Sequence, residues 1–461
     1  MPFKRLNYLI KSFIEKPAGS IILSYIGIIL LGAIMLMPPY ANADGNWLAF
    51  INALFTATSA ICVTGLIVVD TATAFTPIGQ IIILVLIQIG GLGIMIISYF
   101  GTYLMRRKTS IKDKKTIQFL LDEQDTKKIS KTIVDIFKIT ILFEFIGAVL
   151  LFFKFNDSFG NTPKTLLFSV FHSISAFCNA GFALFSDSME GFKSSLLING
   201  VIASLIILGG ISFIVITDIK ELIFSFIKNK FFNKTREKIK LSVNTKVVLI
   251  SSGFLILTGM IMIYAFEHKS NLIQYKLPTQ YLGAFFQSVT LRTAGFNTIP
   301  IGQLQLATLL IMVLYMFIGG ASGSTAGGIK VNTFSIIYAY IRSVFTGKDH
   351  TIILNHHLKK GLINRAFLLL TLSLLTVFAG TLILSFTEPF NFERLLFEAT
   401  SAFGTVGLST GITFDLSLLG KITIIILMYI GRLGPLTLMI GLSQQKARHN
   451  VKYPTGKIMI G

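Results

Sequence analysis

Four short stretches of the chain carry residues whose types and spacing suggest chemistry. Each begins with Phe, continues through small and hydroxylated residues, and places a glycine ten positions later. They are FTATSAICVTGL (55–66), FHSISAFCNAGF (171–182), FFQSVTLRTAGF (285–296) and FEATSAFGTVGL (397–408). Their glycines, Gly65, Gly181, Gly295 and Gly407, recur at intervals of 116, 114 and 112 residues. Four copies in register indicate an internal repeat.

The chemistry that suits this pattern is the coordination of a cation by backbone carbonyls. A ring of carbonyl oxygens replaces an ion's hydration shell without a fixed charge, so the ion can leave again. Aiming consecutive carbonyls at one axis needs unusual backbone angles, which glycine adopts without a Cβ clash. A single glycine of this kind is usually a turn residue, but four equivalent copies favour an ion filter. The filter residues that we predict are Val63, Thr64, Gly65, Asn179, Ala180, Gly181, Thr293, Ala294, Gly295, Thr405, Val406 and Gly407.

Apolar segments flank each stretch and must position it. The stretches themselves are too short to cross a bilayer, which takes about 20 residues of helix. They fit a short helix that enters the membrane and returns as extended chain, an arrangement tolerated only inside protein or along a water-filled cavity. The flanking helices are predicted at 18–37 and 78–104, 133–153 and 195–226, 247–266 and 303–344, and 363–386 and 416–442.

These segments predict an all-α polytopic membrane protein built from four helix–pore loop–helix repeats. The fold would have eight transmembrane helices and four re-entrant pore loops, with pseudo-four-fold symmetry around a central ion pore. The repeats are expected at 1–108, 109–230, 231–350 and 351–461, the last with the C-terminal tail.

The composition supports a membrane protein. Of the 461 residues, 53% are hydrophobic and 13% are charged, and the mean hydropathy is +0.73. A soluble protein carries about 25% charged residues. The first apolar segment is longer than the 7–15 residues typical of a signal peptide's apolar region, so we expect it to be retained as a helix.

The net charge is +20. The positions of the basic residues along the chain indicate whether this charge serves membrane topology or nucleic-acid binding. Lys and Arg cluster at the N-terminus, in blocks that begin at Arg106 and Lys228, between 342 and 365, and after Lys446. The clusters join one repeat to the next, which is the positive-inside pattern with both termini in the cytoplasm. We therefore expect a multi-pass protein of the inner (plasma) membrane. Nucleic acid is not expected as a partner, because the basic residues do not form one contiguous face.

The third repeat contains an anomaly, the stretch FIGGASGSTAGGIKV (317–331), inside a segment of about 40 residues. An unbroken helix of that length would extend about 60 Å, about twice what a bilayer needs. A phosphate-binding loop is excluded, because Ser or Thr does not follow Lys330. Small residues at Gly319, Gly323 and Gly327 could form a helix-packing face. That reading leaves the poor helix formers at 322–324 unexplained, so we expect an intramembrane loop at 318–330, in this repeat only.

Together with RTAGFNT (292–298), GGASGSTAGGIK (319–330) and GRLGPLT (431–437), the four stretches resemble the Trk/Ktr/HKT superfamily of potassium transporters, and the KtrB-type membrane subunit in particular. The resemblance covers essentially the whole chain. It implies channel-like K⁺ uptake, with K⁺ held at the filter carbonyls, sodium as a possible activator and no cofactor on this chain. It also implies a homodimer and a cytoplasmic nucleotide-binding regulatory ring of RCK type.

The resemblance further implies that the loop at 318–330 gates the pore. Glycine at position 65, where sodium-preferring relatives carry Ser, favours potassium. The predicted gate residues are Gly319, Gly320, Ser322, Gly323, Ser324, Thr325, Gly327, Gly328, Lys330 and Arg432.

Two basic residues near the loop need partners, because a charge in the membrane centre costs about 2.5–3.5 kcal/mol. We hypothesise that the Arg432 guanidinium donates hydrogen bonds to carbonyls of residues 319–328 and holds the gate shut. Lys330 lies at the cytoplasmic end of the break, or it snorkels to the interface. Arg292, within the third stretch, is expected to turn back into the protein.

Other polar residues permit two readings each. Three acidic residues that follow the stretches could concentrate cations at the outer mouth, or could be solvated turn residues: Asp70, Asp187 and Asp415. Glu398 could aid the filter electrostatically, or could be a carboxylate favoured by a helix dipole. Cys62 and Cys178 occupy equivalent positions and suit close packing.

No catalytic constellation or nucleotide motif is recognisable in the sequence, so we do not expect an enzyme. The alternative to a channel-like protein is a secondary cation transporter that works by alternating access. Inverted repeats of opposite topology are typical of many such transporters. The four copies here share one orientation, which favours the channel-like reading.

Overall fold

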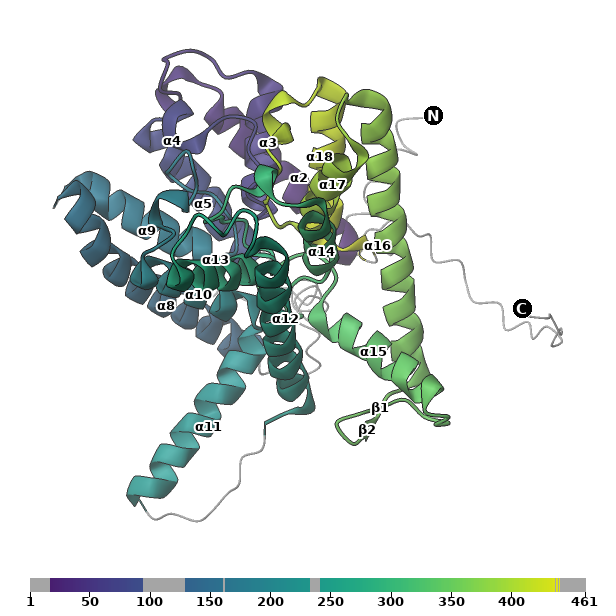
Figure 1. The fold of residues 1–461 in the computed structure, drawn as a ribbon. Helices are drawn as coiled ribbons and strands as arrows, with labels where there is room; N and C mark the ends of the chain where they lie inside the picture. The colour runs from purple at the N-terminus through teal and green to yellow at the C-terminus, as the bar shows by residue number, and fades with distance from the viewer. Residues whose placement is uncertain are drawn as a thin grey trace, which may run out of the picture.

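The computed structural model describes residues 17–93, 129–160, 162–232 and 241–435, together with 437 and 439. These ranges are mostly helical (Figure 1). The helices are α2 (Pro17–Leu36), α3 (Phe50–Ile61), α4 (Thr71–Ala74), α5 (Pro77–Leu92), α8 (Ile129–Phe159), α9 (Pro163–Phe177), α10 (Leu196–Gly210), α11 (Phe213–Phe232), α12 (Val243–Glu267), α13 (Leu277–Thr290), α14 (Leu306–Phe317), α15 (Val331–Phe345), α16 (Lys360–Thr387), α17 (Phe392–Gly404) and α18 (Leu418–Leu433).

Short elements lie between the helices. A two-residue antiparallel ladder, β1 (Ile352–Ile353) with β2 (His356–His357), joins α15 to α16. Single turns of 3₁₀-helix are η1 (Pro39–Ala41), η2 (Glu190–Phe192), η3 (Ile301–Gln303) and η4 (Ile412–Asp415).

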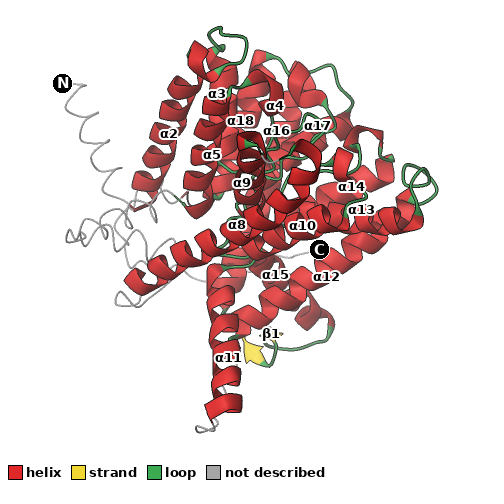
Figure 2. Ribbon diagram, turned by 90° about the vertical axis from the view of Figure 1, so that its left-hand side faces the viewer, coloured by secondary structure: helices red, strands yellow, loops and turns green. Residues whose placement is uncertain are grey.

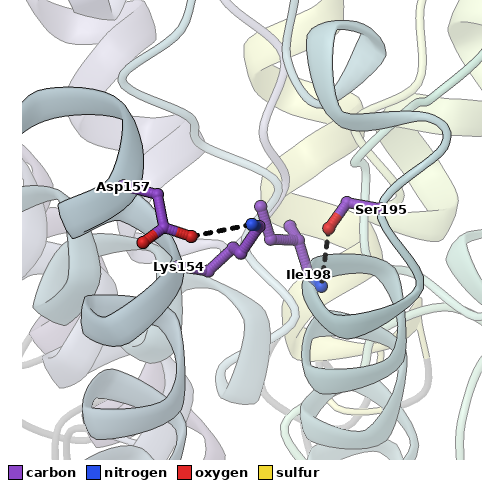
Figure 3. A network of polar contacts seen from close by, with 4 residues as sticks. All are labelled: Lys154, Asp157, Ser195 and Ile198. Carbon is purple, nitrogen blue, oxygen red and sulfur yellow. Dashed lines mark hydrogen bonds and ion pairs between the residues drawn. The ribbon is translucent and has the colours of Figure 1, made fainter.

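Helix starts follow local sequence. Thr76, Thr162, Ser195, Ser242 and Ser417 each precede a helix and accept a backbone N–H near its first turn, as N-cap residues do. Figure 3 shows one case, in which Ser195 Oγ accepts from the N–H of Ile198 at 3.4 Å.

Figure 3 also shows the ion pair between Lys154 and Asp157 near the end of α8, at 2.8 Å. Both side chains are well exposed, at 43% and 61%. A pair of this kind contributes little to stability, because solvent screens it.

Four of the described helices are long and apolar enough to cross a membrane: Ala18–Leu36, Thr132–Phe159, Val243–Glu267 and Lys360–Thr387. Each is the first helix of one predicted repeat. The second helices are shorter or broken, and the count rises to five when the bent pair Leu196–Gly210 and Phe213–Phe226 is one span. The predicted extensions of the second helices to 104 and 442 lie largely outside the described residues.

The prediction of one helix over 195–226 is wrong. The chain forms α10 and α11, with a bend of 103° between them, so the third repeat is not alone in having a broken second helix. The cause is tertiary: the carbonyls of Gly209 and Gly210, which end α10, accept the N–H groups of Thr325 (3.2 Å) and Ala321 (3.0 Å). Beyond the bend, α11 reaches away from the body of the molecule (Figures 1 and 2).

The four short helices that precede the predicted filter are longer than expected. The quoted stretches suggest about ten residues, but α3, α9, α13 and α17 have 12, 15, 14 and 13 residues. In α9 and α13 the start is marked by a proline at the first or second helical position, where its missing N–H is harmless. These helices supply fully buried aromatic side chains to the interior, among them Phe55, Phe171, Phe286 and Phe397.

Packing between helices repeats four times. Each short helix packs on the long helix before it: α3 on α2, α9 on α8, α13 on α12 and α17 on α16. Each second helix packs on the next short helix, in the pairs α5–α9, α10–α13, α14–α17 and α18–α3. The last pair returns to the start of the chain, so these contacts close on themselves.

Candidate functional site

The four repeated glycines lie side by side although they are more than a hundred residues apart. All four have positive φ, with values of 92°, 71°, 80° and 90° in chain order. A Cβ atom placed on Gly65 would lie 3.0 Å from the Cα of Gly181, and one on Gly181 would lie 2.9 Å from the Cα of Gly295. The corresponding distances are 3.3 Å from Gly295 to Gly407 and 3.0 Å from Gly407 to Gly65. We call these four residues the glycine ring.

Carbonyl oxygens surround each position of the glycine ring. The added Cβ would lie 2.5 Å from the Ala180 oxygen at Gly65, 2.8 Å from the Ala294 oxygen at Gly181, and 2.5 Å from the Val406 oxygen at Gly295. At Gly407 it would overlap the Thr64 oxygen. The ring therefore has no room for a side chain, and its members follow the order of the repeats.

The residue two positions before each ring glycine also adopts a left-handed conformation. The φ angles are 55° at Val63, 58° at Asn179, 68° at Thr293 and 49° at Thr405. Three of these residues are β-branched, for which such a conformation is a genuine outlier. Strained backbone of this kind persists only where the surroundings enforce it, and it clusters at functional sites. The sequence indicated unusual angles only for the glycines.

Repeated hydrogen bonds hold the strained segments. The residue before each ring glycine donates its N–H to a carbonyl near the end of its short helix: Thr64 to Ser59, Ala180 to Ser175 and Val406 to Ser401, all at 2.8 Å, and Ala294 to Thr290 at 2.9 Å. In the first and fourth copies, a serine side chain adds a second contact. Ser59 Oγ accepts from the Gly65 N–H, and Ser401 Oγ accepts from the Gly407 N–H, each at 3.1 Å.

In the part of the chain that the structure describes, the backbone carbonyls of the two residues before each ring glycine accept no hydrogen bond. Within the described ranges, no hydrogen bond ends on the carbonyl oxygens of Val63, Thr64, Asn179, Ala180, Thr293, Ala294, Thr405 or Val406. All eight residues are buried. Buried carbonyls are nearly always paired, so a group of free ones is suited to binding a cation.

The segment 318–330 is not helical, and backbone hydrogen bonds join its two ends at a neck formed by Ile318 and Ile329. Ile318 and Ile329 form a parallel bridge, the Gly319 N–H donates to the Ile329 carbonyl at 2.8 Å, and the Val331 N–H donates to the Gly320 carbonyl at 3.0 Å. The expected interruption of the helix is present, and α14 and α15 are separate helices on either side of it.

This segment lies against the strained residues of two repeats. A Cβ on Gly319 would come within 3.2 Å of the Thr293 side chain, and one on Gly327 would overlap Thr405 Oγ1. The segment also reaches the second repeat, where Thr325 Oγ1 lies 2.9 Å from the Gly209 carbonyl. It therefore touches both the predicted filter and the bend after α10.

Arg432 bridges the segment to the first repeat. Its guanidinium donates to the carbonyl of Thr325, as the sequence hypothesis required, and also to the carbonyl of Gly90 at the end of α5, which the sequence did not predict. The second helix of each repeat carries an equivalent triplet: IGG at 89–91, LGG at 208–210, IGG at 318–320 and IGR at 430–432. Arg432 therefore takes the place of the second glycine in the fourth repeat. This alignment could have indicated that Arg432 lies beside Gly90 and the 318–330 segment.

The other two basic groups also bond carbonyls. Arg292 is 6% exposed, turned into the protein as expected, and its Nη2 donates to the Gly319 carbonyl at 2.6 Å. Lys330 folds back toward the segment, where its Nζ donates to the Ala326 carbonyl at 2.5 Å. This contact disfavours the snorkelling alternative. Arg292 and Arg432 thus both attach to 318–330 from outside, and Lys330 forms a bond within it.

The three acidic residues that follow the stretches differ in their surroundings. Asp70 caps α4 through the N–H of Ala72 (2.9 Å) and accepts from Ser186 at 2.6 Å, whereas Asp187 and Asp415 are exposed. Burial raises the pKa of nearby Glu190, and Asp187 adds to the effect. The Asp70 contacts favour its reading as a turn residue.

Sequence reasoning missed one acidic residue in the apolar middle of α8. Glu144 is 8% exposed and accepts from Gln88 Nε2 at 3.3 Å, while its Oε1 lies 3.9 Å from Cys178 Sγ. The carboxyl thus joins the first and second repeats beside Cys178, the residue before Asn179. A glutamate within the apolar run ITILFEFIGAVLLF was the available signal. Cys62 and Cys178 are both free and buried, as packing residues would be.

Comparisons with known proteins identify relatives of this chain. A family of cation transport proteins, TrkH, matches residues 18–451. Ktr system potassium uptake protein B of Bacillus subtilis is 37% identical over 435 residues, 94% of each chain. Potassium/sodium uptake protein NtpJ of Enterococcus hirae is 36% identical over 452 residues, 96% of this chain and 97% of the relative.

The fold has a counterpart among solved structures. The potassium transporter TrkH from Vibrio parahaemolyticus matches with a TM-score of 0.71 over 92% of this chain and 83% of that chain, at 20% identity. The expected resemblance to this group of transporters is confirmed by the family match and by relatives that align over nearly the whole chain. The chain belongs to the TrkH family of cation transport proteins.

Proposed function

We propose that the chain takes up potassium ions across the cell membrane, through a channel-like path lined by the four loops. The observation that carries the proposal is the glycine ring with donor-free carbonyls beside it. Such carbonyls replace the hydration shell of K⁺ and bind it without a fixed negative charge. The names of the relatives, a potassium uptake protein and a potassium/sodium uptake protein, support the choice of ion.

The architecture that we propose is four helix–pore loop–helix repeats, at 1–108, 109–230, 231–350 and 351–461, around one pore. The helix contacts that close on themselves support it. The twelve predicted filter residues would supply the carbonyls. The short helices end at the filter, so their C-terminal dipoles would favour a cation there.

Conduction through a fixed path is the mechanism that we favour over alternating access. Four strained segments pack backbone against backbone at the ring, with no room for a side chain between them, which suits a filter of fixed size. Alternating access would require one group of repeats to rock against the other, and therefore to break these contacts in each cycle.

The segment 318–330 serves as the gate in this proposal. It is anchored from outside by Arg292 and Arg432 and tied internally by Lys330, and it lies close to Thr293 and Thr405. Opening would need the loop to leave these positions. The three positive charges would also repel a cation beneath the filter.

The location, the oligomeric state and the partner that we propose for the chain follow from the family resemblance and from the distribution of basic residues. The chain would lie in the plasma membrane as a homodimer, with both termini in the cytoplasm, where basic linkers meet a nucleotide-binding regulatory ring of RCK type. Sodium would act as an activator.

Uptake is tested in a potassium-uptake-deficient bacterium. We expect the full-length chain, expressed with a regulatory ring, to restore growth at low K⁺ and to take up ⁸⁶Rb⁺ that K⁺ competes for. The matched control is the chain with Gly407→Ala. Absence of ⁸⁶Rb⁺ uptake, with the protein present in the membrane, would contradict the proposed function.

Removing one serine hydroxyl is expected to have a milder effect. In Ser401→Ala the Gly407 N–H loses its side-chain acceptor, and a net hydrogen bond contributes about 0.5–1.5 kcal/mol. We expect ⁸⁶Rb⁺ uptake to fall about two- to tenfold in that variant. Ser204→Ala is the control, because Ser204 Oγ bonds only the Gly200 carbonyl of its own helix. Equal uptake by both variants would rule out a role for the Ser401 hydroxyl.

A further inference from the structure

The second residue of each stretch has a position that the proposed function does not yet use. Thr56, His172, Phe286 and Glu398 each lie nine residues before a ring glycine. All four are buried, with at most 1% of the residue exposed. In the second and fourth repeats this residue bonds the chain that leaves the ring, and in the other two repeats it does not.

His172 holds the chain after Gly181 through one ring nitrogen. Its Nδ1 lies 2.7 Å from the Phe168 carbonyl, and its Nε2 lies 3.2 Å from the Leu184 nitrogen. A carbonyl can only accept and an N–H can only donate, so the network assigns the hydrogen to Nδ1 and a lone pair to Nε2. The imidazole is stacked on Phe185 at 4.9 Å between ring centres, which fixes its orientation.

Glu398 holds the chain after Gly407 in an equivalent way. Its Oε1 accepts from the hydroxyl of Thr413 in η4. Thr413 Oγ1 lies 2.9 Å from Ser409 Oγ, which accepts the Gly411 N–H at 2.9 Å. The carboxyl thus organises the turn at 409–413, within six residues of the ring.

The first and third repeats lack such a brace. Thr56 Oγ1 donates to the Asn52 carbonyl of its own helix at 2.9 Å, and Phe286 has no polar side-chain atom. Because the ring follows the order of the repeats, the second and fourth repeats lie diagonally across it. The two braces therefore act on opposite sides of the ring, across one diameter.

We propose that His172 and Glu398 are positioning residues that fix one diameter of the glycine ring and thereby set the discrimination between K⁺ and Na⁺. The inference rests on the proposed function. Discrimination by carbonyls depends on how closely their positions are held around an ion. A brace that relaxes on one diameter lets the ring contract around the smaller Na⁺.

The test compares two Thr→Val changes of equal volume in the full-length chain. Thr413→Val removes the hydroxyl that donates to Glu398, and Thr56→Val removes a hydroxyl bonded only within its helix; both residues are 1% exposed. His172→Phe keeps the aromatic packing and removes the acceptor for Leu184. Glu398→Gln keeps an acceptor oxygen and serves as the conservative variant.

The measurement is the ratio of the Na⁺ and K⁺ concentrations that halve ⁸⁶Rb⁺ uptake, at membrane levels matched by immunoblot. We expect the ratio to fall about fivefold to tenfold in Thr413→Val and His172→Phe, the scale of one net hydrogen bond. The ratio should stay near the wild-type value in Thr56→Val, and it should fall only slightly in Glu398→Gln. A purely structural role would lower the maximal uptake and leave the ratio unchanged.

An unchanged ratio in Thr413→Val, or an equal fall in Thr56→Val, would overturn the proposal. If His172→Phe does not reach the membrane, Thr413→Val decides, because it removes the hydroxyl that contacts Glu398 and Ser409 without changing the volume. Failure of the proposed function would appear differently, as the absence of ⁸⁶Rb⁺ uptake in the wild-type chain.

Discussion

Alanine in place of Gly407 is expected to abolish ⁸⁶Rb⁺ uptake, with a fall of at least about a hundredfold. The residue has φ of 90°, and a left-handed conformation costs an L-residue about 1–2 kcal/mol. The new methyl group would also overlap the Thr64 carbonyl oxygen and come within 3.0 Å of the Gly65 Cα. Both neighbours are backbone, so the ring itself must move.

Gly411→Ala separates the two causes of the loss, the backbone penalty at positive φ and the close contact of the methyl group with the ring. Gly411 lies four residues further on, has φ of 98°, and has no atom within 4 Å of the position of an added Cβ. The change imposes a similar backbone penalty without a contact at the ring. We expect Gly411→Ala to retain most of the uptake, measured at equal membrane levels. Equal losses in the two variants would show that backbone strain, and not the closeness of the ring, explains the effect.

Arg432→Ala is expected to raise the basal uptake of ⁸⁶Rb⁺ by about tenfold or more when no regulatory ring is present. The guanidinium holds the Thr325 carbonyl of the 318–330 segment and the Gly90 carbonyl of α5 together. A hydrogen bond to a charged group contributes about 1.5–3 kcal/mol. Losing the bond to Thr325 shifts the segment toward its open position by a similar free energy, which corresponds to at least about tenfold in population.

Two further variants decide whether Arg432 acts through the segment. Arg342→Ala, in an exposed position of α15, also removes one positive charge and should leave uptake unchanged. Deletion of residues 322–324, at the tip beyond the neck formed by Ile318 and Ile329, should raise uptake as Arg432→Ala does. Wild-type uptake in both Arg432→Ala and the deletion would contradict the assignment of 318–330 as a gate.

Much of the site could be predicted because its determinants are local. The in-register copies located the ring glycines, and the structure brings them together. The excess length and glycine content of 303–344 located the interruption between α14 and α15. Charge in an apolar segment marked Arg432 as a residue that needs partners, and one of its partners, Thr325, lies in the expected segment.

Other features depended on partners that lie far away in the chain. The glycine pair Gly209–Gly210 alone does not specify the 103° bend, because the groups that satisfy their carbonyls come from 321–325. Likewise, Val63, Thr293 and Thr405 do not favour positive φ, and they adopt it where the chain turns from its short helix into the ring. His172 looked like any residue of an apolar stretch until its bond to Leu184 was known.

The sequence by itself determined the membrane class, the four copies and the residues at their centre, because apolar length, glycine placement and charge act over a few neighbouring residues. Only the tertiary structure decided which carbonyls stay free, that the second helix of the second repeat also breaks, and which buried side chains hold the ring. The break after α10 depends on hydrogen bonds to residues 321 and 325, more than a hundred positions away, and His172 and Glu398 bond Leu184 and Thr413 across the loops that leave the ring. The energies of the bonds between repeats exist only after the repeats have packed against one another.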